Sequence, residues 1–88
     1  MAAELIIVTI CDIRTEKTFD LEVPVQLEIN KLLVDVIQTI MGYAPELTWN
    51  PANTAFFSSR KGKMLEESNT LYDEGIWNGD YLFLTNKY

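Results

Sequence analysis

The segment that decides the fold is INKLLVDVIQTIM, residues 29–41. Its large apolar side chains recur at spacings of three and four residues, which is the period of one face of an α-helix. These side chains are Ile29, Leu32, Leu33, Val36, Ile37, Ile40 and Met41. We expect Glu28 in the first helical turn, where its charge suits the helix dipole, and Gly42 as a left-handed C-terminal cap.

Two strands are predicted before this helix. The first covers Leu5 to Ile13, which is rich in branched aliphatic residues, and the second covers Phe19 to Val23, where apolar and polar residues alternate. Pro24 ends the second strand because proline cannot donate to a ladder. The polar segment 14–17 is a turn, so the two strands form a hairpin. Both faces of the first strand are largely apolar, so its inward face is left open: the even-numbered residues from Ile6, or the odd-numbered ones.

The chain after the helix predicts three more strands. They cover residues 55–59, 64–65 and 81–84. Residues 43–53 form a long loop, in which Trp49 is expected to cap the core or to pack on the loop itself. Residues 66–77 are connecting structure anchored by Leu71 and Ile76. Residues 78–80, Asn-Gly-Asp, form a turn.

One amphipathic helix can cover only one face of a sheet. The order strand, strand, helix, strand, short strand, strand therefore predicts an α+β fold. We expect a mixed sheet of four to five strands, packed on one helix and open to solvent on its other face.

Composition narrows the class of protein. The 88 residues fit one domain, residues 1–88, and the 48% hydrophobic content fills one modest core. A net charge of −6 argues against binding to nucleic acid and to anionic lipid. No segment approaches the ~20 apolar residues of a membrane span, and the first residues do not resemble a signal peptide. Cys11 is the only cysteine, which favours a reducing cytosol.

No set of residues indicates catalysis, and we expect neither enzymatic activity nor a cofactor or metal site. Histidine is absent, so Cys11 has no partner for a Cys-His pair and is interpreted as a small hydrophobe in a strand. The spacing of five carboxylate residues matches no metal-binding loop, and we interpret them as solvated surface charge. They are Glu66, Glu67, Asp73, Glu74 and Asp80. Arg60, Lys61 and Lys63 are interpreted as a solvated turn, with a salt-sensitive contact to an acidic partner as the alternative.

The order and spacing of these elements resemble the β-grasp fold of ubiquitin, with matching stretches at residues 21–23, 62–66 and 70–73. A closer resemblance lies in FDLEVP, residues 19–24, followed by the aliphatic helix, and in residues 71–80 with the strand after them. These stretches resemble the EsaB/YukD family, small ubiquitin-like proteins of type VII (WXG100) secretion systems in Gram-positive bacteria.

The resemblance implies a cytoplasmic accessory or regulatory protein, peripheral to the membrane through its partners. Those partners would be cytosolic domains of membrane-embedded secretion components. The alternatives are a ubiquitin-like interaction domain unrelated to secretion and, less favoured, a conjugated protein modifier. Conjugated modifiers end in two glycines on a flexible tail, and residues 85–88 contain no glycine.

The open sheet face is the predicted protein-interaction site. If Leu82 and Leu84 point inward, Tyr81 and Phe83 point outward. The first and last strands are adjacent and parallel in a β-grasp fold, so Leu5 and Ile7 would lie beside Tyr81 and Phe83 if the even-numbered residues from Ile6 point inward. Trp77 precedes the turn and adds a residue type common at interfaces. The predicted site residues are Leu5, Ile7, Trp77, Tyr81 and Phe83. The alternative is a patch covered by the termini or by self-association into a weak homodimer.

Overall fold

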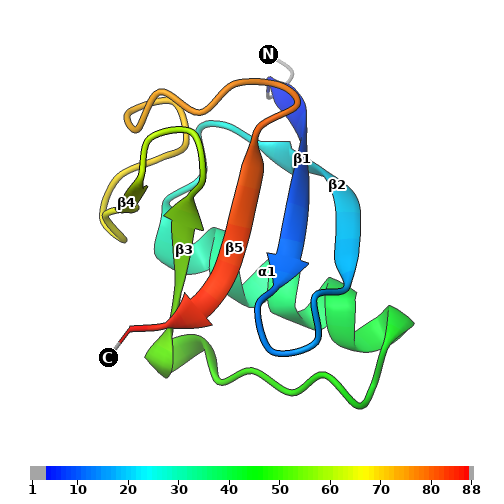
Figure 1. The fold of residues 1–88 in the computed structure, drawn as a ribbon. Coiled ribbons are helices and arrows are strands. Elements are labelled where there is room, and N and C mark those ends of the chain that lie inside the picture. The colour runs from blue at the N-terminus through cyan, green and yellow to red at the C-terminus, as the bar shows by residue number, and fades with distance from the viewer. Residues whose placement is uncertain (1–3, 88) are drawn as a thin grey trace.

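The computed structural model describes residues 4–87 and shows one α-helix packed on a five-stranded sheet (Figure 1). The elements are β1 (Leu5–Asp12), β2 (Thr18–Pro24), α1 (Ile29–Tyr43), the 3₁₀ turn η1 (Pro51–Asn53), β3 (Thr54–Ser58), β4 (Lys63–Met64) and β5 (Tyr81–Asn86). The strand order is β2-β1-β5-β3-β4. Strands β1 and β5 are parallel neighbours and the other pairs are antiparallel. The predicted β-grasp arrangement is confirmed.

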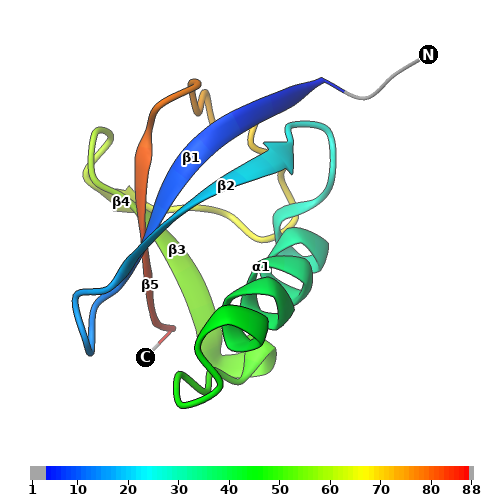
Figure 2. The same cartoon turned by 90° about the vertical axis from the view of Figure 1, so that its right-hand side faces the viewer.

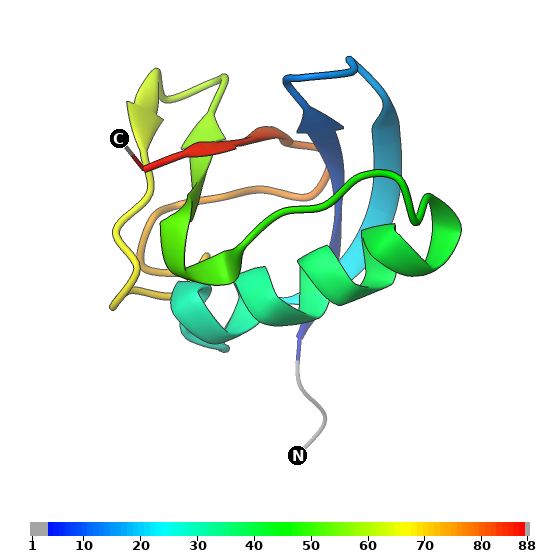
Figure 3. The same cartoon turned by 90° about the horizontal axis from the view of Figure 1, so that it is seen from below.

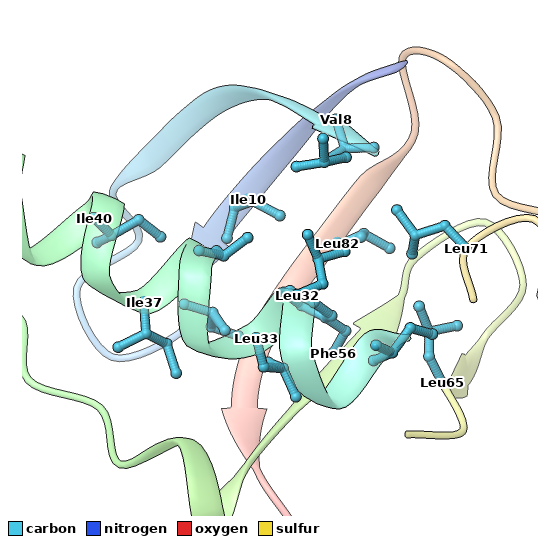
Figure 4. Close-up of a cluster of buried hydrophobic side chains, with 14 of the residues drawn as sticks. Val8, Ile10, Leu32, Leu33, Ile37, Ile40, Phe56, Leu65, Leu71 and Leu82 are labelled. Atoms are coloured by element: carbon cyan, nitrogen blue, oxygen red, sulfur yellow. The ribbon is translucent and has the colours of Figure 1, made fainter. Parts of the chain in front are cut away.

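The core lies between α1 and one face of the sheet (Figures 2 and 3). From the helix it takes Ile29, Leu32, Leu33, Val36, Ile37 and Ile40, all buried. Figure 4 shows this stripe against Val8 and Ile10 of β1, Leu82 of β5 and Phe56 of β3. The open question about β1 is thereby resolved, because its even-numbered residues from Ile6 to Ile10 face the core. Leu71 and Ile76 are buried anchors, as predicted.

Both ends of α1 differ from the sequence prediction. Glu28 is the N-cap residue and precedes the first turn, and its side chain makes no capping hydrogen bond. The free backbone N–H groups of Ile29 and Asn30 donate instead to the carbonyl oxygens of Asn69 (2.8 Å) and Glu67 (3.1 Å). A distant loop therefore satisfies donors that would otherwise need a local cap.

The prediction that Gly42 ends the helix was wrong. The helix continues through Gly42 to Tyr43, and the N–H of Ala44 donates to the carbonyl of Ile40 at 2.8 Å. Ala44 and Leu47 are buried in the core. The chain is therefore held against the core as it leaves the helix, and Gly42 does not adopt the left-handed region.

A buried carboxylate ties the first hairpin to the long loop after α1. Asp12, at the end of β1, is fully buried, and its Oδ2 accepts a hydrogen bond from Trp49 Nε1 at 2.9 Å. Its Oδ1 accepts the backbone N–H of Arg14 at 2.8 Å, while the Arg14 guanidinium lies 3.7 Å over the Trp49 ring. Trp49 caps the core as predicted. No local sequence pattern indicates its carboxylate partner, which lies 37 positions away along the chain.

We expect Trp49→Phe to lower the free energy of unfolding by about 1–3 kcal/mol, because it leaves an oxygen of the buried Asp12 carboxylate without its donor. Urea denaturation measures the change. The matched control is Trp77→Phe, the same substitution at an exposed ring, which should change stability by less than about 0.5 kcal/mol. Equal effects at the two positions would show that the Asp12–Trp49 bond does not stabilise the fold.

Candidate protein-interaction face

Figure 1 looks onto the face of the sheet that α1 leaves uncovered. The odd-numbered residues of β1 lie on this face, where the Leu5 and Ile7 side chains are 50% and 48% exposed. Tyr81 and Phe83 of β5 are half-buried on the same face, opposite the buried Leu82 and Leu84. Trp77 is 64% exposed in the loop that leads into β5.

The ladder between β1 and β5 corrects the predicted neighbours. Thr9 lies opposite Tyr81, and Cys11 lies opposite Phe83. The backbone of Ile7 bonds instead to the preceding turn: its N–H donates to Asn78 Oδ1 (2.8 Å) and its carbonyl accepts the Gly79 N–H (2.7 Å). The prediction that Leu5 and Ile7 lie beside the two aromatic residues was therefore wrong, because the turn uses the ladder position next to Ile7.

The aromatic residues of β5 instead join side chains that the sequence analysis missed. Phe57 of β3 lies opposite Phe83, with ring centroids 6.4 Å apart, and Tyr81 meets Phe83 edge-on at 5.2 Å. Met64 of β4 lies opposite Phe57 on the other side. Phe57, Phe83 and Met64 border a shallow hollow of about 500 Å³, which we call the apolar hollow. It is lined by Ile13, Phe57, Met64, Phe83 and Thr85.

A signal for the missing residues was present in the sequence. In Phe56-Phe57, strand alternation requires one ring to face the core and the other to face outward. The structure buries Phe56 completely and leaves Phe57 half-buried on the open face. Ile13 and Met64 line the same hollow as Phe57 because of the strand order, which alternation alone does not specify.

Cys11 is a buried residue of β1, as its interpretation as a small hydrophobe requires. Its thiol lies 3.8 Å from the backbone carbonyl oxygen of Asp12. A hydrogen bond with this thiol raises the pKa of the Tyr81 phenol, which favours a neutral ring on the open face. Cys11 lies opposite Phe83 in the ladder between β1 and β5.

Asp80 contradicts the interpretation of the acidic residues as solvated charge, because it is buried. Its carboxylate accepts two hydrogen bonds from the Arg60 guanidinium, 2.9 Å from Nε to Oδ1 and 2.8 Å from Nη2 to Oδ2. The backbone N–H of Trp77 donates to the same carboxylate at 2.8 Å. The Arg60 bonds hold the pKa of Asp80 below its usual value, although burial acts in the opposite direction.

Glu74 is buried as well and corrects the same interpretation. Burial acts to raise its pKa, but hydrogen bonds from the Glu66 backbone N–H (2.8 Å), from Lys63 (3.0 Å) and from Asn69 (3.3 Å) bring the net pKa below its usual value. Lys61 donates to the backbone carbonyl of Glu74 at 2.7 Å.

The basic cluster lies in and beside an exposed turn, as predicted, but its side chains are paired within the fold. Arg60, Lys61 and Lys63 each bind the segment from Glu74 to Asp80 and hold this loop against the end of β3 and β4. The Arg60 guanidinium also lies 3.9 Å over the ring of Trp77. The contacts with Arg60 and Asp80 therefore hold the exposed Trp77 in a defined position.

Residues 4–87 contain no group of three or more His, Cys, Asp or Glu side chains placed to hold a metal ion. Over the same residues, no helix has both the length and the apolar character needed to cross a membrane.

Solved structures with the same arrangement define the class of the chain as a ubiquitin-like β-grasp domain. The EccD5 ubiquitin-like domain from Mycobacterium xenopi superposes with a TM-score of 0.77 at 15% identity, over 94% of each chain. The ubiquitin of Caldiarchaeum subterraneum gives 0.71 at 20% identity, over 97% of this chain and 96% of the other. A ubiquitin-like domain of an Arabidopsis thaliana protein gives 0.73 at 20% identity, over 99% and 82%.

The sequence identifies the family within this class. Residues 5–84 match the family described as "WXG100 protein secretion system (Wss), protein YukD". The chain belongs to this family, as its resemblance to EsaB/YukD proteins predicted. No curated protein matches the sequence of the chain.

The lowered pKa values of Glu74 and Asp80 predict a stability that depends on acid pH. A carboxyl group with a lower pKa in the folded chain stabilises the fold above its unfolded pKa, and this contribution is lost as the pH falls through the folded pKa. We expect the free energy of unfolding to decrease as the pH falls below about 4. The double variant Glu74→Gln/Asp80→Asn should be about 1–3 kcal/mol less stable at neutral pH and should show a shallower acid dependence.

Urea denaturation at a series of pH values from about 7 to about 2 measures both effects. Glu22→Gln, at an exposed carboxylate of β2, is the control and should keep the slope of the unmodified protein. If the double variant also kept that slope, the two buried carboxylates would not be the origin of the acid sensitivity.

Proposed function

We propose that this ubiquitin-like domain is a non-enzymatic docking protein of a WXG100 (type VII) secretion system and that it binds through its open sheet face. The family links the chain to this secretion system. The observation that carries the mode of action is the apolar hollow, which places large apolar side chains in solvent on a face that α1 leaves uncovered.

The hollow has the features of an interaction site. Exposed apolar groups that gather at one place favour association, because a partner removes them from water. Phe57, Phe83 and Met64 come from three different strands of one sheet, so their positions depend on its ladders. A rigid surface loses little side-chain entropy on binding, which improves affinity at a given contact area.

The partner is a cytosolic domain of a membrane-embedded secretion component, and the chain acts in the cytoplasm. Membrane proximity then comes from the partner. Trp77 on its Arg60 support is a second anchor, at the end of the sheet where β5 begins. Tryptophan is enriched among the few residues that dominate interface energies.

The alternative proposal is a ubiquitin-like interaction domain outside secretion, which would use the same hollow for an unrelated partner. Binding to purified cytosolic domains of the secretion components separates the two. A conjugated modifier is the less favoured alternative, and mass spectrometry that finds covalent adducts of the chain in cells would support it.

We expect Phe83→Ala to weaken binding to the cytosolic domain of the secretion component by about tenfold or more, since an aromatic anchor contributes more than about 1.4 kcal/mol. Trp77→Ala and Met64→Ala should weaken binding as well. Isothermal titration calorimetry measures the affinity, and circular dichroism verifies that each variant is folded.

Tyr43→Ala is the matched control, because it removes an exposed aromatic residue at the end of α1, on the other layer of the fold. It should bind as the unmodified protein does. Equal binding by all four variants would refute the assignment of the open face, and binding that is lost only with Tyr43→Ala would move the site to the helix.

A further inference from the structure

β2 is the edge strand of the sheet, on the side away from the apolar hollow, and within residues 4–87 it is flanked by β1 alone (Figure 2). In β1 the backbone N–H and C=O groups of the odd-numbered residues point toward β5 and the turn before it. The Ile7 carbonyl accepts the Gly79 N–H, and the Thr9 N–H donates to the Asp80 carbonyl. The even-numbered residues of β1 therefore bond to β2.

This alternation identifies the free backbone groups of β2. Phe19, Leu21 and Val23 lie opposite even-numbered residues of β1 and complete the ladder. Asp20 and Glu22 lie between them, so their N–H and C=O groups point away from the sheet. A free edge with its donors and acceptors aligned is a template for one more strand.

A groove runs between this edge and α1. It has a volume of about 190 Å³ and lies on the side of β2 that faces the helix. It is lined by Leu21, Glu22, Val23, Pro24, Leu32, Asp35, Val36 and Thr39. A strand added to β2 would point alternate side chains toward this groove, because successive residues face opposite sides of a sheet.

Charge specifies what the added strand must be. The side chains of Asp20 and Glu22 are exposed on the open face, and Asp35 adds a third carboxylate at the groove. Basic residues at the positions of an added strand opposite Asp20 and Glu22 stabilise the pairing, because opposite charges attract across a strand pair. A second copy of this chain is disfavoured, since pairing two β2 strands would set these carboxylates against one another.

We propose that the β2 edge binds an extended segment of another protein as a sixth strand. This segment alternates basic residues, opposite Asp20 and Glu22, with branched apolar residues that enter the groove beside Leu21 and Val23. The site is separate from the apolar hollow, so the result at one surface does not depend on the other.

The probe is a synthetic peptide of alternating lysine and valine, titrated into the full chain labelled with ¹⁵N. We expect saturable binding, with the largest chemical-shift changes in β2 and α1, and slower hydrogen exchange at the amides of Asp20 and Glu22. Slower exchange distinguishes strand addition from contact through side chains alone, because only a new ladder covers those N–H groups. Shift changes confined to β3 and β5 would overturn the proposal.

Two further peptides test for nonspecific attraction to an acidic protein. A peptide of the same composition in lysine and valine blocks has the same charge but cannot place the two residue types on opposite faces. It should bind about tenfold more weakly, as should an alternating glutamate-valine peptide. Equal affinity for the alternating and block peptides would overturn the proposal.

Substitutions in the chain test the contributions of the β2 edge and of the groove to peptide binding separately. Glu22→Lys should weaken binding of the lysine-valine peptide by about tenfold and strengthen binding of the glutamate-valine peptide. Glu66→Lys is the control, because it makes the same change in net charge at an exposed residue beyond β4, at the other edge of the sheet. Thr39→Phe fills the groove from the exposed side of α1 and should also weaken binding. Equal losses with Glu66→Lys and Glu22→Lys would refute a site at β2.

Discussion

The contact between the apolar stripe of α1 and one face of the sheet is the constraint from which the other features follow. The stripe is continuous from Ile29 to Ile40, and it meets strands from both ends of the chain. Because the chain has a single α-helix over its described residues, the other face stays in contact with solvent. A domain of this size buries only about 60–65% of the surface of its unfolded chain, so the uncovered face is where an apolar surface can persist.

Buried carboxylates, each with several hydrogen-bond donors, hold the irregular parts of the chain to this core. The loop between β4 and β5 contains no regular strand or helix, and its place is set by Leu71 and Ile76 and by the carboxylates of Glu74 and Asp80. Each carboxylate has several donors, which offsets the free-energy cost of removing a charge from water. Because Asp80 is bound by Arg60, the turn that leads into β5 has a defined position, and so has Trp77.

The sheet offers two surfaces of different character. Toward β3 and β4 the open face is apolar, with Phe57, Phe83 and Met64 around the hollow. Toward β2 it is acidic, with Asp20 and Glu22 beside a free edge. Acidic side chains on an edge strand also limit unspecific pairing with other sheets. The two surfaces therefore lie toward opposite edges of the sheet.

By itself the sequence determined the elements, their order and the membership in the ubiquitin-like group. Local signals suffice there: the period of the segment 29–41, the alternation from Phe19 to Val23 and the Asn-Gly-Asp turn each depend on neighbours along the chain. The same alternation puts Leu82 and Leu84 on one face of β5 and Tyr81 and Phe83 on the other, and the structure buries the two leucines.

Only the tertiary structure decided which residues share a surface. Alternation says that Ile7 and Phe83 face outward, but the register that sets Thr9 opposite Tyr81 and Cys11 opposite Phe83 goes together with bonds from Ile7 to the turn at Asn78 and Gly79. The burial of Asp12, Glu74 and Asp80 likewise depends on donors far along the chain, such as Trp49 and Arg60. Charge and strand period are local properties, whereas a ladder register and the donors of a buried carboxylate exist only once distant segments have met.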